Sequence, residues 1–317
     1  MKNFWDEEEA TACGDDPLAL RVYSSRLIGR ASDLVLHGGG NTSVKAEFTD
    51  IFGVRHEVLY VKGSGWDLAT IEAAGFSPVV LDALMQLSRF DVLSDADMVR
   101  AQRAAMLDPG APNPSVEAIL HALIPFRFVD HTHADAVVTL TNTPDGEARI
   151  RELYGDRLLV VPYVMPGFVL AKKVAQMTEG IDWTTLQGMV LMNHGIFSFA
   201  EDARESYTRM IDLVTEAEQA LGVVPSPTTG QSGASALELA TIRYEVSRAA
   251  NRPMLAAFSG SSQSHCFSKR DDVVSIATRG PLTPDHVIRT KRVPLMVNDD
   301  PAVAVAKFVS DYKDYFD

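Results

Sequence analysis

Cysteine is nearly absent from this chain, since its 317 residues include only Cys13 and Cys266. The two lie far apart and outside any spacing that ligates a metal, so nothing points to a disulfide framework and a reducing compartment is favoured. The N-terminus lacks a basic region followed by an apolar stretch, and no apolar run approaches the ~18 residues that span a bilayer. We therefore expect a cytoplasmic protein with no membrane segment.

Positive charge is also scarce, with 29 Lys and Arg against 42 Asp and Glu and a net charge of −13. This balance argues against a nucleic-acid partner, because phosphate backbones require a basic face. It does not exclude a small phosphorylated substrate, which needs only a local pocket of donors. Acidic residues at positions 6–9 predict a flexible, solvated N-terminus over residues 1–14.

Apolar periodicity predicts helices and strands mixed without strict alternation, and hence a layered α/β fold around a mixed, largely antiparallel sheet. A Gly-, Pro-, Ser- and Thr-rich segment at 224–235 is the best domain boundary. Helices are expected at 16–32, 78–90, 95–107, 115–123, 166–176, 201–221, 236–249 and 301–315. Strands are expected at 42–48, 57–62, 128–131, 136–140, 156–161, 189–192 and 196–199, and near 273–277 and 294–297.

Two histidines in the segment VDHTHADAVVTL, His131 and His133, stand two residues apart on an expected strand. Residues i and i+2 of a strand project from one face, so the two imidazoles can converge on one ion. A third ligand is offered by His194, which lies in an Asn-His-Gly turn between two apolar strands. Three imidazoles with an open fourth position predict a catalytic zinc site rather than a closed structural one.

A carboxylate, Glu117, stands near the start of an expected helix in PNPSVEAILHALI. One interpretation is a first-turn acid favoured by the helix dipole. The other is an acid/base group beside the metal, which would remove a proton α to a carbonyl. His121 shares a helical face with Glu117, and we interpret it as a packing residue.

Three donor-bearing turns complete the pattern: HGGGNTSVK (37–45), VKGSGWDL (61–68) and the helix start at Pro114-Ser115. Glycines let backbone amides approach an anion, and hydroxyls add donors. Together with three histidines, these turns make a phosphate pocket plausible. Lys45 and Lys62 either add charge to it or are simply solvated. Neither glycine run matches a Walker or dinucleotide-binding fingerprint.

Taken in order, GGGNTSVK, VKGSGW, PSVE, HTHA and MNHG resemble the class II aldolase/adducin family, which includes fuculose- and rhamnulose-1-phosphate aldolases. The resemblance covers residues 15–222 and implies a three-layer α/β/α fold with residues 223–317 as a C-terminal extension. It implies zinc, or another divalent metal, on His131, His133 and His194, and Glu117 as the acid/base. It further implies that the substrate phosphate is bound by Gly40, Asn41, Ser64, Gly65 and Ser115.

The segment GPLTPDHVIRTKRVPLMV (280–297) resembles the aldolase half of bacterial proteins in which a class II aldolase is fused to a short-chain dehydrogenase. The chain is then either a free-standing protein or the first half of such a fusion. Two features depart from the simple aldolases: Val116 replaces a second serine, and no tyrosine motif supplies the proton donor. Tyr154 and Tyr163 are candidates for that donor by position alone.

The function implied by the resemblance is a zinc-dependent aldolase in a homotetramer. It would cleave a rhamnulose-1-phosphate-like ketose to dihydroxyacetone phosphate and an aldehyde. The same scaffold also supports sugar-phosphate epimerases and dehydratases, and adducins are non-catalytic relatives that have lost the metal residues. The segment around Asp285 and His286 either covers the site or only joins two domains.

Overall fold

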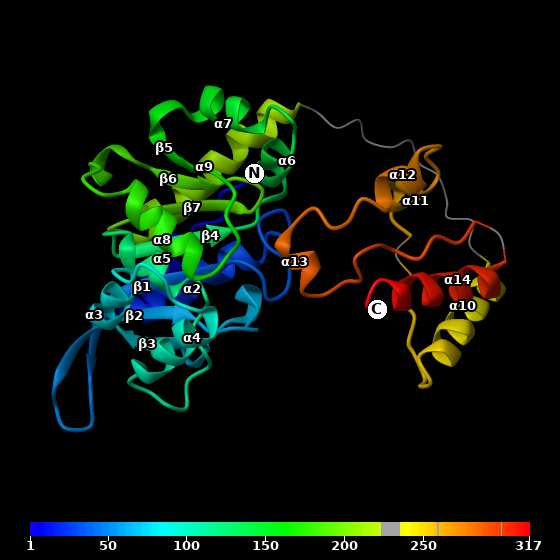
Figure 1. Cartoon of the computed structure of the whole chain (residues 1–317). Helices are drawn as coiled ribbons and strands as arrows, with labels where there is room; N and C mark the ends of the chain where they lie inside the picture. The colour runs from blue at the N-terminus through cyan, green and yellow to red at the C-terminus, as the bar shows by residue number, and fades with distance from the viewer. Residues whose placement is uncertain (223–234, 259, 299) are drawn as a thin grey trace. The chain divides into compact units, whose positions relative to one another are not determined.

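The computed structural model describes residues 1–222, 235–258, 260–298 and 300–317. They divide into two compact units (Figure 1). The first unit comprises Met1–Gly222 together with the short segment Leu282–Ile288, and the second unit contains the other described residues. The segment 282–288 therefore belongs to the first unit although it is distant in the chain.

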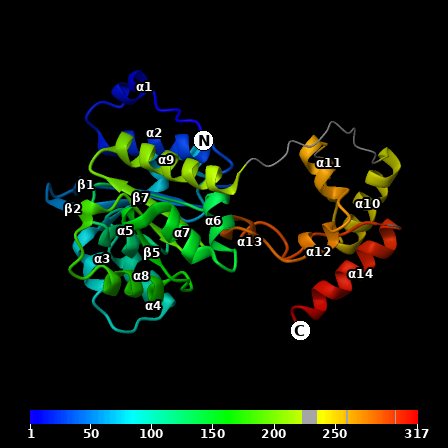
Figure 2. The same ribbon diagram turned by 90° about the horizontal axis from the view of Figure 1, so that it is seen from above.

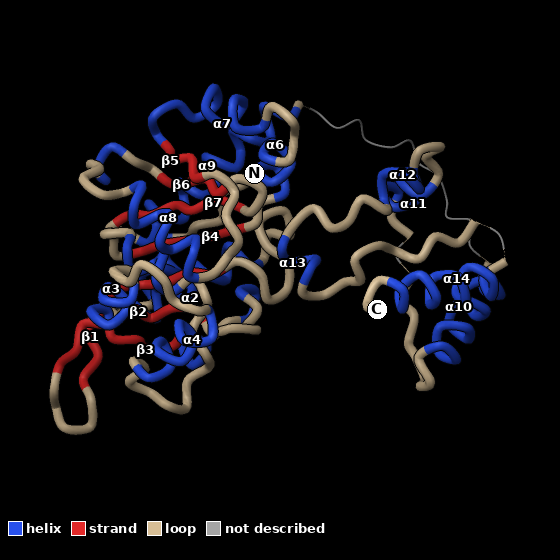
Figure 3. Tube along the Cα trace, in the orientation of Figure 1, coloured by secondary structure: helices blue, strands red, loops and turns tan. Residues whose placement is uncertain are grey.

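A seven-stranded sheet forms the middle of the first unit, with strand order β3-β2-β1-β4-β7-β6-β5 (Figure 3). Every neighbouring pair is antiparallel except β5 and β6, which are parallel. This mixed, largely antiparallel sheet confirms the predicted fold class. The strands are β1 (Asn41–Thr49), β2 (Arg55–Lys62), β3 (Phe76–Val80), β4 (Phe128–Thr132), β5 (Leu158–Val161), β6 (Gly188–Leu191) and β7 (Gly195–Ala200).

Helices cover both faces of this sheet and give the first unit its three layers (Figure 2). One face is packed by α2 (Pro17–Gly29), α6 (Asp135–Thr141), α7 (Gly146–Tyr154) and α9 (Ala203–Leu221). The other is packed by α3 (Leu81–Leu87), α4 (Asp95–Ala104), α5 (Ala118–Leu123) and α8 (Phe168–Met177). Each face has its own apolar core, so strands β4 and β7 are buried throughout, as is the first half of β1.

Capping residues account for several helix starts. Asp16 accepts a hydrogen bond from the amide of Leu18 and is followed by Pro17 at the first helical position of α2. Asp202 caps α9 in the same way through the amide of Glu205. The acidic N-terminal run also forms a helix, α1 (Glu7–Ala12), which is capped by Asp6.

The prediction of a strand at 136–140 is wrong, because these residues lie in helix α6. Nearly all of them are buried, and a fully buried apolar run has neither the period of a strand nor that of a helix. The strands expected near 273–277 and 294–297 are also wrong: the first is helix α12 (Val273–Ala277), and the second has no regular structure.

Strand β3 and helix α7 of the first unit were missed in the sequence, as were the short helices α1 and α11 (Ser262–Ser268). Strand β3 was expected to be the start of a helix over 78–90, although Pro78 fits a strand because β3 lies at the edge of the sheet. Helix α7 was not predicted at all. Its polar exposed face and short length leave a weak periodic signal.

The second unit is helical in its described residues, with α10 (Ala236–Ala249), α11 (Ser262–Ser268), α12 and α14 (Pro301–Asp314). Helices α10 and α14 pack against each other. The remaining helix, α13 (Pro284–Val287), lies in the segment that belongs to the first unit. No helix in the described part of the chain is both long and apolar enough to cross a membrane.

Candidate metal centre

Two of the predicted metal ligands come from strand β4 and the residue that follows it. His131 lies within the strand and is fully buried, and His133 comes directly after its last residue, Thr132. The His131 ring stacks on Phe197 of β7, with ring centroids 4.2 Å apart, and its Nδ1 donates to the carbonyl of Ile196 at 3.1 Å. This donation leaves Nε2 as the nitrogen with a free lone pair.

His194 approaches the same point from the turn between β6 and β7. Asn193 has φ of 58°, and its amide group donates to the carbonyl of Thr141 at 3.1 Å. Gly195 follows the histidine, and a Cβ there would lie 2.3 Å from the carbonyl oxygen of Thr132. Only glycine lets this turn approach β4 closely enough to bring His194 to the other two imidazoles.

The three imidazoles form the geometry of a metal site. One ligand nitrogen of each of His131, His133 and His194 lies within 4.8 Å of the others. Nε2 of His131 and Nε2 of His133 are 3.2 Å apart. Two nitrogens bound tetrahedrally at typical Zn–N distances stand about 3.3 Å apart, so this spacing fits a single bound ion.

Burial keeps these imidazoles in the form that binds metal. Burial, followed by the neighbouring His133 and His194, holds the pKa of His131 well below its usual value. Burial likewise lowers the pKa of His194, against the opposing effect of Glu117. Neutral imidazole is the ligating form, so burial keeps His131 and His194 ready to bind a divalent cation near neutral pH.

Glu117 lies at the N-cap position of α5 and is 5% exposed, so its carboxylate is buried. Its Oε2 is 3.5 Å from Nε2 of His131, and its Oε1 is 3.6 Å from Nε2 of His194. Among the described residues, no hydrogen-bond donor contacts this buried Oε1. A cation held by the histidines would satisfy that oxygen, so the donor set fits a divalent metal.

A chain of hydrogen bonds fixes the Glu117 carboxylate. Nδ2 of Asn41 donates to Glu117 Oε2 at 2.6 Å. Oδ1 of Asn41 then accepts from Nε2 of His121, whose Nδ1 accepts from the Ser43 hydroxyl at 2.7 Å. Since a carboxylate only accepts, it determines the orientation of every group in the chain. His121 was expected to be a packing residue, but it holds Asn41 against the acid/base candidate.

The three predicted donor turns converge beside Glu117. Asn41 also contacts the Ser115 hydroxyl at 3.2 Å, and the amide of Ser115 donates to the carbonyl of Lys62 at 3.1 Å. The amide of Ser64 donates to the carbonyl of Asn113 at 2.8 Å, which leaves its hydroxyl as the available donor. Gly65 is exposed in the same turn, with φ of 86°.

Gly40 is buried where the glycine run meets β4, with φ of 57°. A Cβ at this position would lie 2.6 Å from Cγ1 of Val35 and 2.8 Å from the carbonyl oxygen of His131. The absence of a side chain thus lets the run pack directly on the strand that carries His131. Gly40 therefore has a packing role, which is separate from the phosphate contact expected of it.

The two lysines are not simply solvated. Nζ of Lys45 donates to the carbonyls of Ile124 and Phe126 at 2.5 and 2.7 Å, near the end of α5, so Lys45 is a structural cap. Nζ of Lys62 donates to the carbonyl of Gly38 at 2.8 Å, and burial lowers its pKa to about 8. Lys62 thus carries most of its positive charge at neutral pH beside the glycine run.

The two tyrosines considered as proton donors occupy different environments. Tyr154 is 1% exposed within the core, and its hydroxyl donates to the carbonyl of Leu213 at 2.7 Å. This partner gives Tyr154 a structural role. Tyr163 is 55% exposed and remains the candidate of the two that can reach solvent or another subunit.

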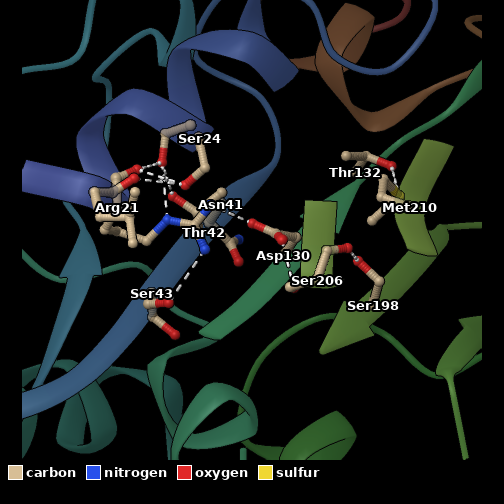
Figure 4. Close-up of polar contacts among 12 residues, drawn as sticks. Arg21, Ser24, Asn41, Thr42, Ser43, Asp130, Thr132, Ser198, Ser206 and Met210 are labelled. Atoms are coloured by element: carbon tan, nitrogen blue, oxygen red, sulfur yellow. Dashed lines mark hydrogen bonds and ion pairs between the residues drawn. The ribbon is translucent and has the colours of Figure 1, made fainter. Parts of the chain in front are cut away.

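Beneath the site, the opposite face of β4 carries a buried ion pair (Figure 4). The Arg21 guanidinium on α2 lies 2.5 Å from Oδ1 of Asp130, and both side chains are fully buried. Asp130 also accepts from the Ser206 hydroxyl of α9 at 2.5 Å. The strand that presents His131 on one face is thus held on its other face by two helices.

The sequence left the segment around Asp285 and His286 open between a cover for the site and a link between two domains. Asp285 lies in α13 (Figure 1) and is 2% exposed. Its Oδ1 is 2.5 Å from Nδ1 of His133, and its Oδ2 accepts from the amide of Leu36 at 2.7 Å. His133 and Asp285 are 152 residues apart in the chain, so no local sequence pattern predicts their contact.

Comparison with known proteins agrees with this fold. Residues 21–221 match the family described as class II aldolase and adducin N-terminal domain, and residues 233–317 match the second domain of class II aldolases. The chain therefore belongs to the class II aldolase/adducin family.

Two members of known sequence or structure are similar to this chain. The chain is 33% identical to the uncharacterized oxidoreductase YuxG of Bacillus subtilis, with 100% of this chain and 49% of that protein aligned. The chain thus spans about half the length of the curated relative that it matches. A solved structure, the N-terminal class II aldolase domain of a conserved protein from Thermoplasma acidophilum, is 41% identical. It covers 70% of this chain and 99% of its own, with a TM-score of 0.63.

Proposed function

We propose that this protein is a zinc-dependent aldolase that cleaves a ketose 1-phosphate, of the rhamnulose-1-phosphate type, to dihydroxyacetone phosphate and an aldehyde. The observation that carries the proposal is the Glu117 carboxylate. It faces the Nε2 atoms of two histidines in the triad, and one of its oxygens has no protein partner among the described residues. A structural metal site would close around its ligands, whereas this one keeps a fixed carboxylate at an open position.

The residues divide the chemistry between them. A divalent cation held by His131, His133 and His194 supplies electrophilic stabilisation of the charge that develops on the substrate carbonyl oxygen. A base removes the proton of the C4 hydroxyl, and the C3–C4 bond breaks to release the aldehyde. Glu117, protonated by that base through solvent, then delivers the proton from its carboxyl group to C3 of the three-carbon fragment. Asn41 keeps that carboxyl group aimed by its 2.6 Å hydrogen bond to Oε2.

The phosphate is assigned to the convergent turns beside Glu117. The hydroxyls of Ser64 and Ser115 provide donors on this side of the site, and Asn41 joins Ser115 to the acid/base residue. Buried Lys62 adds a positive charge nearby. Because Val116 replaces the second serine of the simple aldolases, this pocket offers one hydroxyl fewer. We therefore assign its selectivity among sugar phosphates to the shape of the pocket rather than to the number of donors.

Assembly and fusion are further parts of the same proposal. We propose a homotetramer, in which a neighbouring subunit supplies the tyrosine that this site lacks. We also propose that the aldolase works next to a dehydrogenase, since the Bacillus subtilis relative is about twice as long and is named an oxidoreductase.

The decisive experiment combines a substrate screen with one substitution. Purified protein is incubated with a panel of ketose 1-phosphates, and aldehyde release, isomer formation and bound zinc are measured on the same sample. Glu117→Gln should lower turnover by about 10²–10⁴-fold while zinc is retained, because the amide can still accept from Asn41 but cannot transfer the proton. Glu152→Gln, an exposed glutamate on α7, is the matched control. Full aldehyde release by Glu117→Gln would refute the proposed role, and isomer formation without aldehyde would identify an epimerase.

A further inference from the structure

We propose that Asp285 is a positioning residue of the metal centre, supplied by the C-terminal family domain to a site otherwise built from residues of the N-terminal domain. It orients His133 by accepting a hydrogen bond from Nδ1, so that Nε2 faces the other ligands. The inference rests on the metal site of the proposed function and is independent of its substrate.

The contact between Asp285 and His133 has the geometry of a carboxylate that supports a metal-bound imidazole. Oδ1 of Asp285 lies 2.5 Å from Nδ1 of His133, while Nε2 of the same ring lies 3.2 Å from Nε2 of His131. An acceptor at Nδ1 fixes the proton there and leaves the Nε2 lone pair for the ion. A carboxylate also raises the basicity of the ligand it contacts.

The three histidines differ in how their second nitrogen is held. Nδ1 of His131 donates to the carbonyl of Ile196 at 3.1 Å, within the sheet itself. Nδ1 of His194 is buried and has no hydrogen-bond partner among the described residues. Among the Nδ1 atoms of the three histidines, only that of His133 contacts a charged group within the described part of the chain, namely the Asp285 carboxylate. Of the described residues, Asp285 is therefore the one charged group that fixes the ring of a ligand through its Nδ1.

Asp285 is itself held by the glycine run, which gives that run a role besides phosphate binding. Its Oδ2 accepts from the Leu36 amide at 2.7 Å. A Cβ placed on Gly39 would lie 1.6 Å from Oδ1 of Asp285, and its three nearest atoms all belong to this carboxyl group. The Asp285 carboxylate therefore occupies the space that a side chain at position 39 would fill. Both oxygens of this carboxylate have a hydrogen-bond partner.

The position of Asp285 in the chain is consistent with a role beyond local packing. Helix α13 begins after Thr283, which is 2% exposed and whose hydroxyl bonds Nδ1 of His286 at 2.7 Å. The flanking residues Val287 and Ile288 are more than 60% exposed, so the segment buries a polar carboxylate while it leaves its apolar side chains in solvent. Burying a carboxylate is costly unless it is hydrogen-bonded, as it is here.

The test measures metal binding in the full chain without any substrate. Zinc affinity is determined by competition with a chromogenic chelator, and the cobalt-substituted protein gives a visible spectrum that reports ligand geometry. Asp285→Ala should weaken zinc binding by about 10–100-fold and change the cobalt spectrum. Val287→Ala, an exposed position on the same helix, is the matched control and should leave both unchanged.

Gly39→Ala tests the same contact while Asp285 and His133 both remain in the protein. Its new methyl group should displace Asp285 and weaken zinc binding in the same direction. The double variant Gly39→Ala/Asp285→Ala should bind zinc no more weakly than Asp285→Ala alone, because the two changes act on one contact. Additive losses of zinc affinity would mean that Gly39 does not act through Asp285. They would count against the proposed packing of the Asp285 carboxylate against Gly39.

Asp285→Asn separates positioning from simple filling of space. Asparagine keeps the volume, but it has one acceptor oxygen for the two donors, so we expect a smaller loss of zinc affinity and a partly restored cobalt spectrum. This variant is also the one to measure should the alanine variant not fold. Folded Asp285 variants with wild-type zinc affinity and an unchanged cobalt spectrum would overturn the proposal. A protein without aldolase activity that still loses zinc affinity in these variants would refute the proposed function and leave this inference intact.

Discussion

The two units of this protein bury their side chains in very different ways. The first unit has an apolar core on each face of its sheet, and ionic and hydrogen-bonded groups within those cores. In the second unit, among the residues that the structure describes, only Glu245 and Val305 are buried. Small units bury a smaller share of their surface, and this one gains little from a core of its own.

This contrast shows where a catalytic site can be built. The three histidines and Glu117 are buried in or next to elements of this unit, and such packing holds side chains to the precision that chemistry requires. Within the C-terminal domain, segment 282–288 belongs to the first unit and so shares this environment. A loosely packed domain can thus contribute to a rigid site if one short segment of it is seated in the rigid part.

The largest expected effect comes from breaking the ion pair beneath the site. Asp130→Asn leaves the Arg21 guanidinium buried without a counter-charge and should lower the free energy of unfolding of the first unit by about 3–5 kcal/mol. Urea unfolding measures it, followed by tryptophan fluorescence for the first unit and by far-ultraviolet circular dichroism for the helical second unit, which has no tryptophan. In the second unit, Asp272→Asn removes the partner of Arg270 from a half-exposed pair and should change little. Equal losses in the two variants would refute the contrast between the units.

The next effect is a dependence of stability on pH that comes from buried His121. Burial lowers its pKa to about 3 in the folded protein, whereas an unfolded histidine titrates near 6.5. Between these values the unfolded chain binds the additional proton, so stability falls as the pH is lowered from 6.5 towards 3. His121→Gln keeps a donor towards Asn41 and should remove roughly 2–3 kcal/mol of the loss between pH 6.5 and 4.5.

Metal-free protein is used for this measurement, with urea unfolding at both pH values. His131 and His194 also have lowered pKa values, so the variant should keep part of the pH dependence. The matched control is His56→Gln, because His56 lies in the exposed β1–β2 hairpin, where it pairs with Asp50. An identical pH dependence in His121→Gln and the native protein would show that His121 is already protonated in the folded state.

The fold and the metal centre differ in how far the sequence predicts them. Periodicity placed helix 236–249 at the bounds that the structure has, and the spacing of His131 and His133 placed two imidazoles on one side of a strand. The sequence left Glu117 open between an acid/base group and a helix-start carboxylate, and it did not predict that this side chain is buried. Local patterns succeed where the partners lie on one element or on adjacent strands.

What escaped prediction depends on distant partners or on complete burial. The run at 136–140 is buried nearly throughout and so has no polar face to reveal its period. His121 has Asn41 and Ser43 as partners, about 80 residues earlier in the chain. Asp285 reaches across 152 residues to His133, and the sequence around it shows only a helix start. Such contacts are set by the tertiary fold.

The smallest expected effect lies in the second unit and sharpens the comparison most directly. Val305→Ala removes two carbon atoms from a side chain of α14 that is 5% exposed, which should cost roughly 1–2 kcal/mol. Amide hydrogen exchange, read by mass spectrometry, should become faster in α10 and α14 because these two helices pack together. Strands β4 and β7 should keep their protection, and so should segment 282–288, because their contacts lie in the first unit. Faster exchange in the strands as well would show that the two units unfold as one cooperative block, and would tie the stability of the metal centre to the packing of α14.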